Sequence, residues 1–293
     1  MQSRRKFIKN TAITSLFLTG LPSISKTNYF SFFDDYDEAI CRKKFKLLVD
    51  TGLKSMPIGD AIIEVGRSFL DTDYVAGTLD KNMSESLVIN LTGLDCVTFV
   101  ENCLTFARCI KLGATTFDDY KAELKKIRYR GGSIDGYASR LHYFCDWITD
   151  NEEKGIVKNV SSEIGGVEYS KKINFMSTHT GSYKQLSSQA NIDGINSAEE
   201  AINSRIYYYI PKNDIAKSYD FMKNGDIIAT TTSIGGLDVT HTGYVVKGED
   251  GSTYFLHASS KSKKVIISGS QLADYVGEDS KKTGIMVARP LEV

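Results

Sequence analysis

The sequence has no net charge, no Cys-x-x-Cys pair and no apolar run of about 20 residues. Its 36 basic residues balance 36 acidic ones, and no basic stripe stands out, so a nucleic-acid partner is not expected. Paired cysteines are typical of structural zinc sites, so neither a metal nor another cofactor is predicted. The five cysteines leave at least one unpaired within the chain, and the sequence assigns no disulfide.

The N-terminus has the pattern of an export signal. Arg4 and Arg5 form a twin-arginine pair, a short apolar stretch follows, and Ser23 and Ser25 have the spacing that a signal peptidase prefers. We predict that residues 1–25 are a cleaved twin-arginine signal, with an ordinary secretory signal as the alternative. The protein is then expected in the bacterial periplasm, without a stable membrane anchor after cleavage.

The remaining residues, 26–293, are enough for a single catalytic domain with an inserted substrate-binding segment at about 112–205. Amphipathic or capped patterns predict helices at 36–52, 57–70, 95–111, 116–129, 139–148 and 198–204. A short strand is expected at 86–90, and period-two patterns from Arg205 onward predict strands at 207–210, 226–231, 239–247, 253–258, 265–268 and 285–289. Helices first and strands afterwards indicate an α+β fold, not a doubly wound α/β fold.

One cysteine stands where a glycine-containing loop becomes a helix. Asp95 fits the N-cap position, and Cys96 follows it directly. Unpaired backbone N–H groups and the macrodipole stabilise a thiolate at a helix N-terminus, so we expect a lowered pKa and a nucleophilic role for Cys96. Cys103 and Cys109 lie inside the same predicted helix, where small core residues are expected.

Two histidines occur on neighbouring predicted strands. A three-residue loop, 249–251, sets His257 opposite Gly243, on the same face as His241 and diagonal to it. Diagonal neighbours are about 7–8 Å apart, within side-chain reach. A two-residue turn would put the histidines on opposite faces. We therefore expect the longer loop, a histidine pair and open space beside the imidazole at Gly243.

At these motifs the chain resembles the NlpC-type papain-like cell-wall hydrolases, in which a cysteine, a histidine and a third polar residue form the triad. The blocks that carry the resemblance are Tyr74-Val75-Ala76-Gly77, Leu94-Asp95-Cys96-Val97-Thr98-Phe99-Val100, Asn224-Gly225-Asp226-Ile227-Ile228, His241-Thr242-Gly243-Tyr244-Val245 and Phe255-Leu256-His257-Ala258-Ser259. The forms LDCVTFVE, YRGGSIDGYASRLHYFCDWI and INFMSTHTGSY resemble a narrower branch, the N-acetylmuramoyl-L-alanine amidase-like enzymes specific for anhydromuramyl peptides. Thr98 departs from the small Ser-Gly pair usual after the cysteine.

The resemblance implies a papain-like fold and hydrolysis of the amide between N-acetylmuramic acid, in its anhydro form, and L-alanine. The substrate is then a muropeptide or peptidoglycan fragment. We expect Cys96 as nucleophile, His241 as general base and acid, and His257 as the residue that orients His241. Two alternatives stay open: an endopeptidase that cuts the γ-D-glutamyl bond to the diamino acid, and a non-catalytic muropeptide-binding protein.

Several further residues have both a functional and a structural interpretation. The Cys96 N–H is an expected oxyanion donor, and the Tyr74 hydroxyl is a second candidate that is equally explained by packing. Asp95 is expected to cap its helix and not to act as a catalyst, and Glu101 to bond backbone or substrate. Residues that could contact the sugar, or instead belong to the core and helix surface, are Arg140, His142, Tyr143 and Trp147.

Overall fold

The computed structural model describes residues 27–293, with side chains described from residue 36 onward. The predicted signal segment, residues 1–25, lies outside the described residues. The helices are α1 Thr27–Val49, α2 Ile58–Arg67, α3 Cys96–Leu112, α4 Phe117–Arg128, α5 Phe144–Glu153, α6 Phe175–Thr178, α7 Gln189–Asn203 and α8 Leu272–Gly277. A 3-10 helix, η7, spans Lys212–Phe221. Among residues 27–293, no helix combines the length and apolarity that crossing a bilayer requires.

The strands form one mixed sheet that is mostly antiparallel. They are β1 Asp73–Tyr74, β2 Gly93–Leu94, β3 Val157–Asn159, β4 Val167–Glu168, β5 Tyr208–Pro211, β6 Ile227–Thr232, β7 Val239–Lys247, β8 Thr253–Ser259, β9 Lys264–Ile267 and β10 Lys282–Pro290. Their order is β2-β1-β9-β8-β7-β6-β10-β5-β4, with β3 also paired to β10. Within the described residues, β1 and β2 are the parallel pair. The α+β prediction is confirmed.

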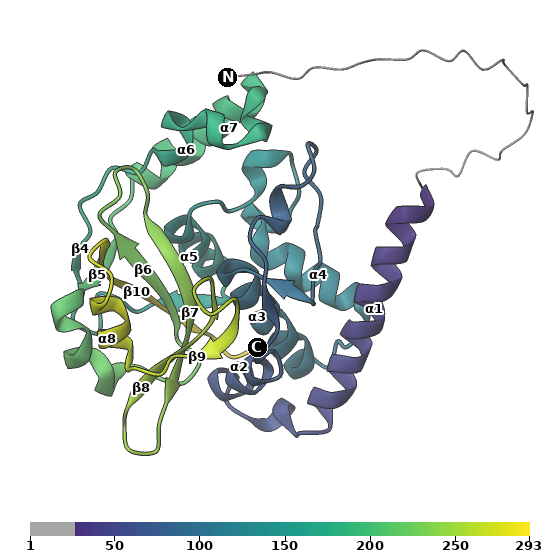
Figure 1. Cartoon of the computed structure of the whole chain (residues 1–293), viewed down its shortest axis with the longest axis horizontal. Helices are drawn as coiled ribbons and strands as arrows, with labels where there is room; N and C mark the ends of the chain where they lie inside the picture. The colour runs from purple at the N-terminus through teal and green to yellow at the C-terminus, as the bar shows by residue number, and fades with distance from the viewer. Residues whose placement is uncertain (1–26) are drawn as a thin grey trace, which may run out of the picture.

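The sheet has helices α2 and α3 on one side and α8 on the other (Figure 1). It thereby separates two clusters of buried apolar residues. On one face α2 and α3 pack against strand residues such as Tyr244 and Leu256. On the other face α8 and η7 cover Val245 and Phe255. Residues alternate between the two faces because successive side chains of a strand point in opposite directions. The face on which a strand side chain lies therefore determines whether it packs against α2 and α3 or against α8 and η7.

Some predicted elements differ from the structure. Residues 86–90 form no strand, and the carbonyls of Ser86 and Val88 instead accept hydrogen bonds from the side chains of Tyr129 and Arg128. The helix expected at 139–148 starts five residues later, at Phe144, after a 3-10 turn at Tyr137–Ser139. The short helix expected at 198–204 is the end of α7, which begins at Gln189. The segment 112–205 contributes β3, which pairs with β10, and β4, which pairs with β5. It is therefore joined to the same sheet as the later strands.

Candidate active site

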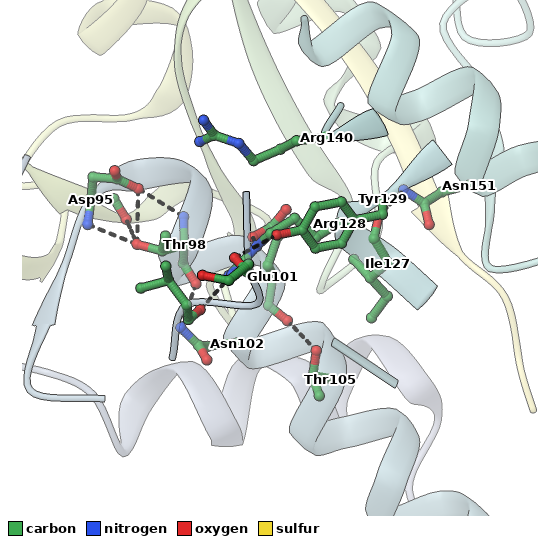
Figure 2. Close-up of polar contacts among 12 residues, drawn as sticks. Asp95, Thr98, Glu101, Asn102, Thr105, Ile127, Arg128, Tyr129, Arg140 and Asn151 are labelled. Atoms are coloured by element: carbon green, nitrogen blue, oxygen red, sulfur yellow. Dashed lines mark hydrogen bonds and ion pairs between the residues drawn. The ribbon is translucent and has the colours of Figure 1, made fainter. Parts of the chain in front are cut away.

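Helix α3 begins in a capping box that fixes the position of Cys96. The Asp95 carboxylate accepts the Thr98 N–H at 2.8 Å, and the Thr98 hydroxyl accepts the Asp95 N–H at 2.9 Å (Figure 2). Two otherwise unpaired backbone donors are thereby satisfied. At the other end Gly113 closes the helix with a φ of 75°. The expected role of Asp95 as a helix cap is confirmed, and Thr98 completes the same motif.

Cys96 differs from the other four cysteines because it is partly exposed, whereas they are buried. All five are free thiols. Burial of the sulfur and the neighbouring Asp95 carboxylate raise the pKa of the Cys96 thiol to about 12. Backbone N–H groups of Thr242, Val97 and Cys96 bond the sulfur and act in the opposite direction. The expectation of a lowered pKa is therefore wrong for the resting state, because desolvation outweighs the helix N-terminus.

The β7–β8 hairpin has the register that the three-residue loop predicts. Tyr244 pairs with Leu256, and the loop closes through Gly251, whose φ is 83°. His241 and His257 consequently share a face, and His241 Nε2 lies 2.7 Å from His257 Nδ1. The open space expected at Gly243 is absent, since an added Cβ there would lie 2.8 Å from the His257 Cβ. Glycine is needed at this position for close strand packing.

The histidine pair lies on the α8 face of the sheet among aromatic rings. The His257 ring stacks on Phe255 with centroids 4.7 Å apart and lies 5.0 Å from the Tyr275 ring. Burial and the nearby Lys282 cation lower the pKa of His257 to about 4. Burial, then His257 and then Lys282 lower the pKa of His241 well below its usual range. Both imidazoles are therefore neutral near pH 7, and a neutral imidazole can accept a proton.

The sulfur of Cys96 meets β7 beside the histidine pair. It accepts a hydrogen bond from the backbone N–H of Thr242, the residue after His241. Pairing between β7 and β8 runs from Lys247–Thr253 to Tyr244–Leu256 and stops before Thr242. Cys96, the first residue of α3, thus contacts β7 at Thr242, which lies past the last residue pair that β7 forms with β8. This contact brings the cysteine and the histidines to one end of the hairpin, although α3 and the imidazoles lie on different faces.

Tyr74 lies in β1 next to this end of α3. It follows Asp73 in the strand and pairs with Leu94 of β2, two residues before Cys96. Burial, followed by the charges of Cys96 and Asp95, raises the pKa of the Tyr74 hydroxyl to about 12. The hydroxyl therefore stays protonated at neutral pH and is available as a hydrogen-bond donor.

Most of the predicted substrate residues meet in a cavity of about 220 Å³ on the Asp95 side of the cysteine. Its lining includes Glu101, Arg140, His142 and Tyr143. Arg140 Nη2 lies 2.5 Å from Asp80 Oδ1, and its Nε lies 3.4 Å from Glu85 Oε1.

Other side chains of this cavity are also engaged by the protein. His142 Nε2 is 2.8 Å from the Tyr137 carbonyl, and the Tyr143 hydroxyl donates to Glu199 at 2.7 Å. Glu101 pairs with the Arg128 guanidinium (Figure 2) at 2.7 Å. Both side chains are only 2% exposed. The charges that line this cavity are therefore largely neutralised within the protein.

Trp147 is the predicted substrate residue that the structure places elsewhere. It is 0% exposed and stacks on Phe144 with ring centroids 4.9 Å apart. A ring that is fully enclosed by protein cannot stack on a sugar. Trp147 packs in the core because the helix begins at Phe144 and turns this residue inward.

A larger cavity of about 690 Å³ opens on the histidine side. Both His241 and His257 line it, together with Tyr275, Lys282 and several hydroxyl side chains. Tyr275 and Lys282 were not among the predicted site residues, because the six-residue α8 has no side-chain cap and Lys282 precedes the predicted strand at 285–289. The described residues contain no cluster of three or more histidine, cysteine, aspartate or glutamate residues that could hold a metal ion.

The mixed sheet positions a partly exposed cysteine at a helix start and a hydrogen-bonded histidine pair. These are the residue types that hydrolases with a cysteine nucleophile use. Residues 64–285 match the family described as N-acetylmuramoyl-L-alanine amidase-like, and the chain belongs to this family. The family and the neighbours below support a hydrolase. No curated protein sequence matches the chain.

Solved structures share the fold of this chain. An N-acetylmuramoyl-L-alanine amidase from Bacteroides uniformis is 37% identical with a TM-score of 0.76, covering 80% of this chain and 99% of that one. A protein from Bacteroides fragilis, named as a candidate xylanase, is 38% identical with a TM-score of 0.72, covering 76% and 98%. A Legionella pneumophila protein of the DUF1460 family has the same fold at 20% identity, with a TM-score of 0.68, covering 89% and 96%.

Proposed function

We propose that this chain is a cysteine amidohydrolase that cleaves the amide between N-acetylmuramic acid, in its anhydro form, and L-alanine of peptidoglycan fragments. The family match and the amidase name of the Bacteroides uniformis neighbour support the bond class. The observation that carries the catalytic assignment is the 2.7 Å contact between His241 and His257, next to the residue whose N–H bonds the Cys96 sulfur. The arrangement also supports a papain-like fold of the NlpC type.

In this mechanism the thiol needs a base, because burial and Asp95 keep it protonated at rest. His257 Nδ1 accepts the His241 Nε2–H, which leaves His241 Nδ1 free to take the thiol proton as the sulfur attacks the acyl carbon. The tetrahedral intermediate collapses when His241 gives that proton to the leaving L-alanine amine. Water then hydrolyses the thioester and releases the free muramic lactyl carboxylate and the thiol.

Two donors are proposed to stabilise the oxyanion. The Cys96 N–H stands in the first turn of α3, where backbone donors have no partner within the helix, and it belongs to the attacking residue itself. The Tyr74 hydroxyl is protonated because burial raises its pKa. Removal of one such donor typically costs about 10²–10³ in rate. Arg140, His142 and Tyr143 line the cavity on the Asp95 side, where we propose that the sugar binds.

The deciding experiment compares Cys96→Ala with Cys103→Ala on a defined anhydromuramyl peptide. Cys103 is 0% exposed and lies on the same helix, so it is a matched control. We expect Cys96→Ala to lose on the order of 10⁴-fold or more in kcat and Cys103→Ala to retain activity. Mass analysis of the products should find a free L-alanine amine and an intact sugar. Wild-type turnover in Cys96→Ala contradicts the proposal, and cleavage at the γ-D-glutamyl bond identifies an endopeptidase instead.

We also propose that the protein is exported to the periplasm and released from its signal. The support is the twin-arginine pair Arg4-Arg5 and the small residues that follow the apolar stretch. Cell fractionation of the wild type and of an Arg4→Lys, Arg5→Lys variant tests this. Export that is unchanged in the variant but lost when the general secretory pathway is blocked would assign an ordinary secretory signal.

A further inference from the structure

The larger cavity contains a cation that the proposed chemistry leaves unused. Lys282 is only 8% exposed, and it lines the cavity of about 690 Å³ together with His241 and His257. A β-bulge between Lys282 and Gly284 breaks the regular pairing of β10 with β6 at this point. Bulges re-aim side chains, and here the ammonium group lies over the Tyr275 ring, 3.8 Å from its centroid.

This ammonium group has no carboxylate partner among the described residues. Glu278 and Asp279 also line the cavity and influence Lys282 electrostatically, but neither forms an ion pair with it within 4 Å. A second polar atom among the lining residues also lacks a partner: His257 Nε2 is buried without a hydrogen bond. Burying a cation without an anion costs free energy, so a carboxylate that enters the cavity gains a charge-assisted partner.

The rest of the lining suits a carboxylate as well. Hydroxyl side chains surround the space, and they are Thr240, Ser259, Ser260, Ser262, Ser268 and Ser270. By contrast, the cavity on the Asp95 side holds Arg140, which Asp80 and Glu85 already neutralise. Of the two cavities, the one on the histidine side therefore holds a buried cation without an ion-pair partner, although Glu278 and Asp279 line the same space.

The direction of the reaction places the peptide on this side. In the proposed mechanism His241 gives its proton to the leaving amine, so the L-alanine peptide must leave past the histidine pair. The glutamyl residue that follows L-alanine is linked through its γ-carboxyl group, so its α-carboxylate is free. We propose that Lys282 binds this carboxylate and thereby selects acidic stem peptides over amidated ones. The inference rests on the proposed function and adds the orientation and charge of the substrate.

The test uses two muramoyl peptides that differ in one group, a free or an amidated glutamyl α-carboxyl. Lys282→Gln is compared with Lys281→Gln, whose side chain is exposed and adjacent in sequence. We expect Lys282→Gln to raise KM for the acidic peptide on the order of 10–100-fold, with little change for the amidated peptide or in Lys281→Gln. Equal KM changes for both peptides, or no change, overturn the inference.

Two further measurements keep the outcome interpretable. Binding of both peptides to Cys96→Ala and to the Cys96→Ala, Lys282→Gln double variant separates recognition from catalysis. Lysine-dependent binding of the acidic peptide without any cleavage by the wild type would contradict the proposed function and leave the carboxylate site standing. If Lys282→Gln does not fold, wild-type affinities decide, and equal affinity for the acidic and amidated peptides overturns the inference.

Discussion

At the scale of single residues, the surroundings of Cys96 determine the pKa of its thiol. Donors at the start of α3 and the Thr242 N–H favour a thiolate, but desolvation and the Asp95 carboxylate together outweigh them. The same carboxylate is the helix cap, so one side chain stabilises the element and opposes ionisation of its neighbour. In the proposed mechanism the thiol therefore transfers its proton to His241 during attack, instead of resting as an ion pair with it.

Asp95→Asn separates these two effects. Asparagine caps helices about as well as aspartate, so the free energy of unfolding should change little. Loss of the negative charge should lower the Cys96 pKa, because Asp95 raises it in the wild type. The rate of Cys96 alkylation plotted against pH should then rise at lower pH than in the wild type. A Thr98→Val control keeps the charge, and an unshifted curve in Asp95→Asn would show that burial alone sets the pKa.

At the scale of elements, the β7–β8 hairpin connects loop length to the position of the histidines. The three-residue loop was predictable because only an odd-length connection puts His241 and His257 on one face. Helices α3 and α4 were equally predictable from Asp95, Gly113 and Thr116, since caps are local signals. Elements without local signals were missed, such as α8, whose six residues are held by packing on the sheet.

Gly251 provides a test of the hairpin. Its φ is 83°, and an added Cβ would meet no atom within 4 Å, so a substitution changes only the backbone preference. Gly251→Ala should lower the free energy of unfolding by about 1–2 kcal/mol, and Gly251→Asn by less, because asparagine tolerates this conformation better. Urea denaturation measures both. Activity should be unchanged because the register is retained, and an inactive but folded Gly251→Ala would argue against a stable hairpin register.

At the scale of the whole molecule, a buried ion pair joins α3 to α4 next to the site. Arg128 donates from Nε to Glu101 and from Nη1 to the Val88 carbonyl at 2.5 Å, linking the end of α4 to the segment before β2. Glu101 was expected to bond backbone or substrate, yet its carboxylate holds this arginine while it lines the smaller cavity. The pair therefore positions one wall of that cavity.

Breaking this pair should be costly, because one charge would remain buried without its partner. Arg128→Met and Glu101→Met are each expected to lower the free energy of unfolding by about 3–5 kcal/mol. The double variant should lose less than the sum of the two, since it leaves no uncompensated charge. Urea denaturation of all four proteins gives the coupling energy. Additive losses would mean that the two charges are solvated independently.

The sequence by itself determined the features that depend on neighbours along the chain. The helix caps, the strand alternation and the hairpin loop follow from local geometry, and they place Cys96 at a helix start and both histidines on one face. Only the tertiary structure decided which surfaces those residues meet. The Thr242 contact, the burial of Trp147 and the cavity around Lys282 each join segments distant in the sequence. Their positions come from long-range packing, which leaves no periodic signal in the chain.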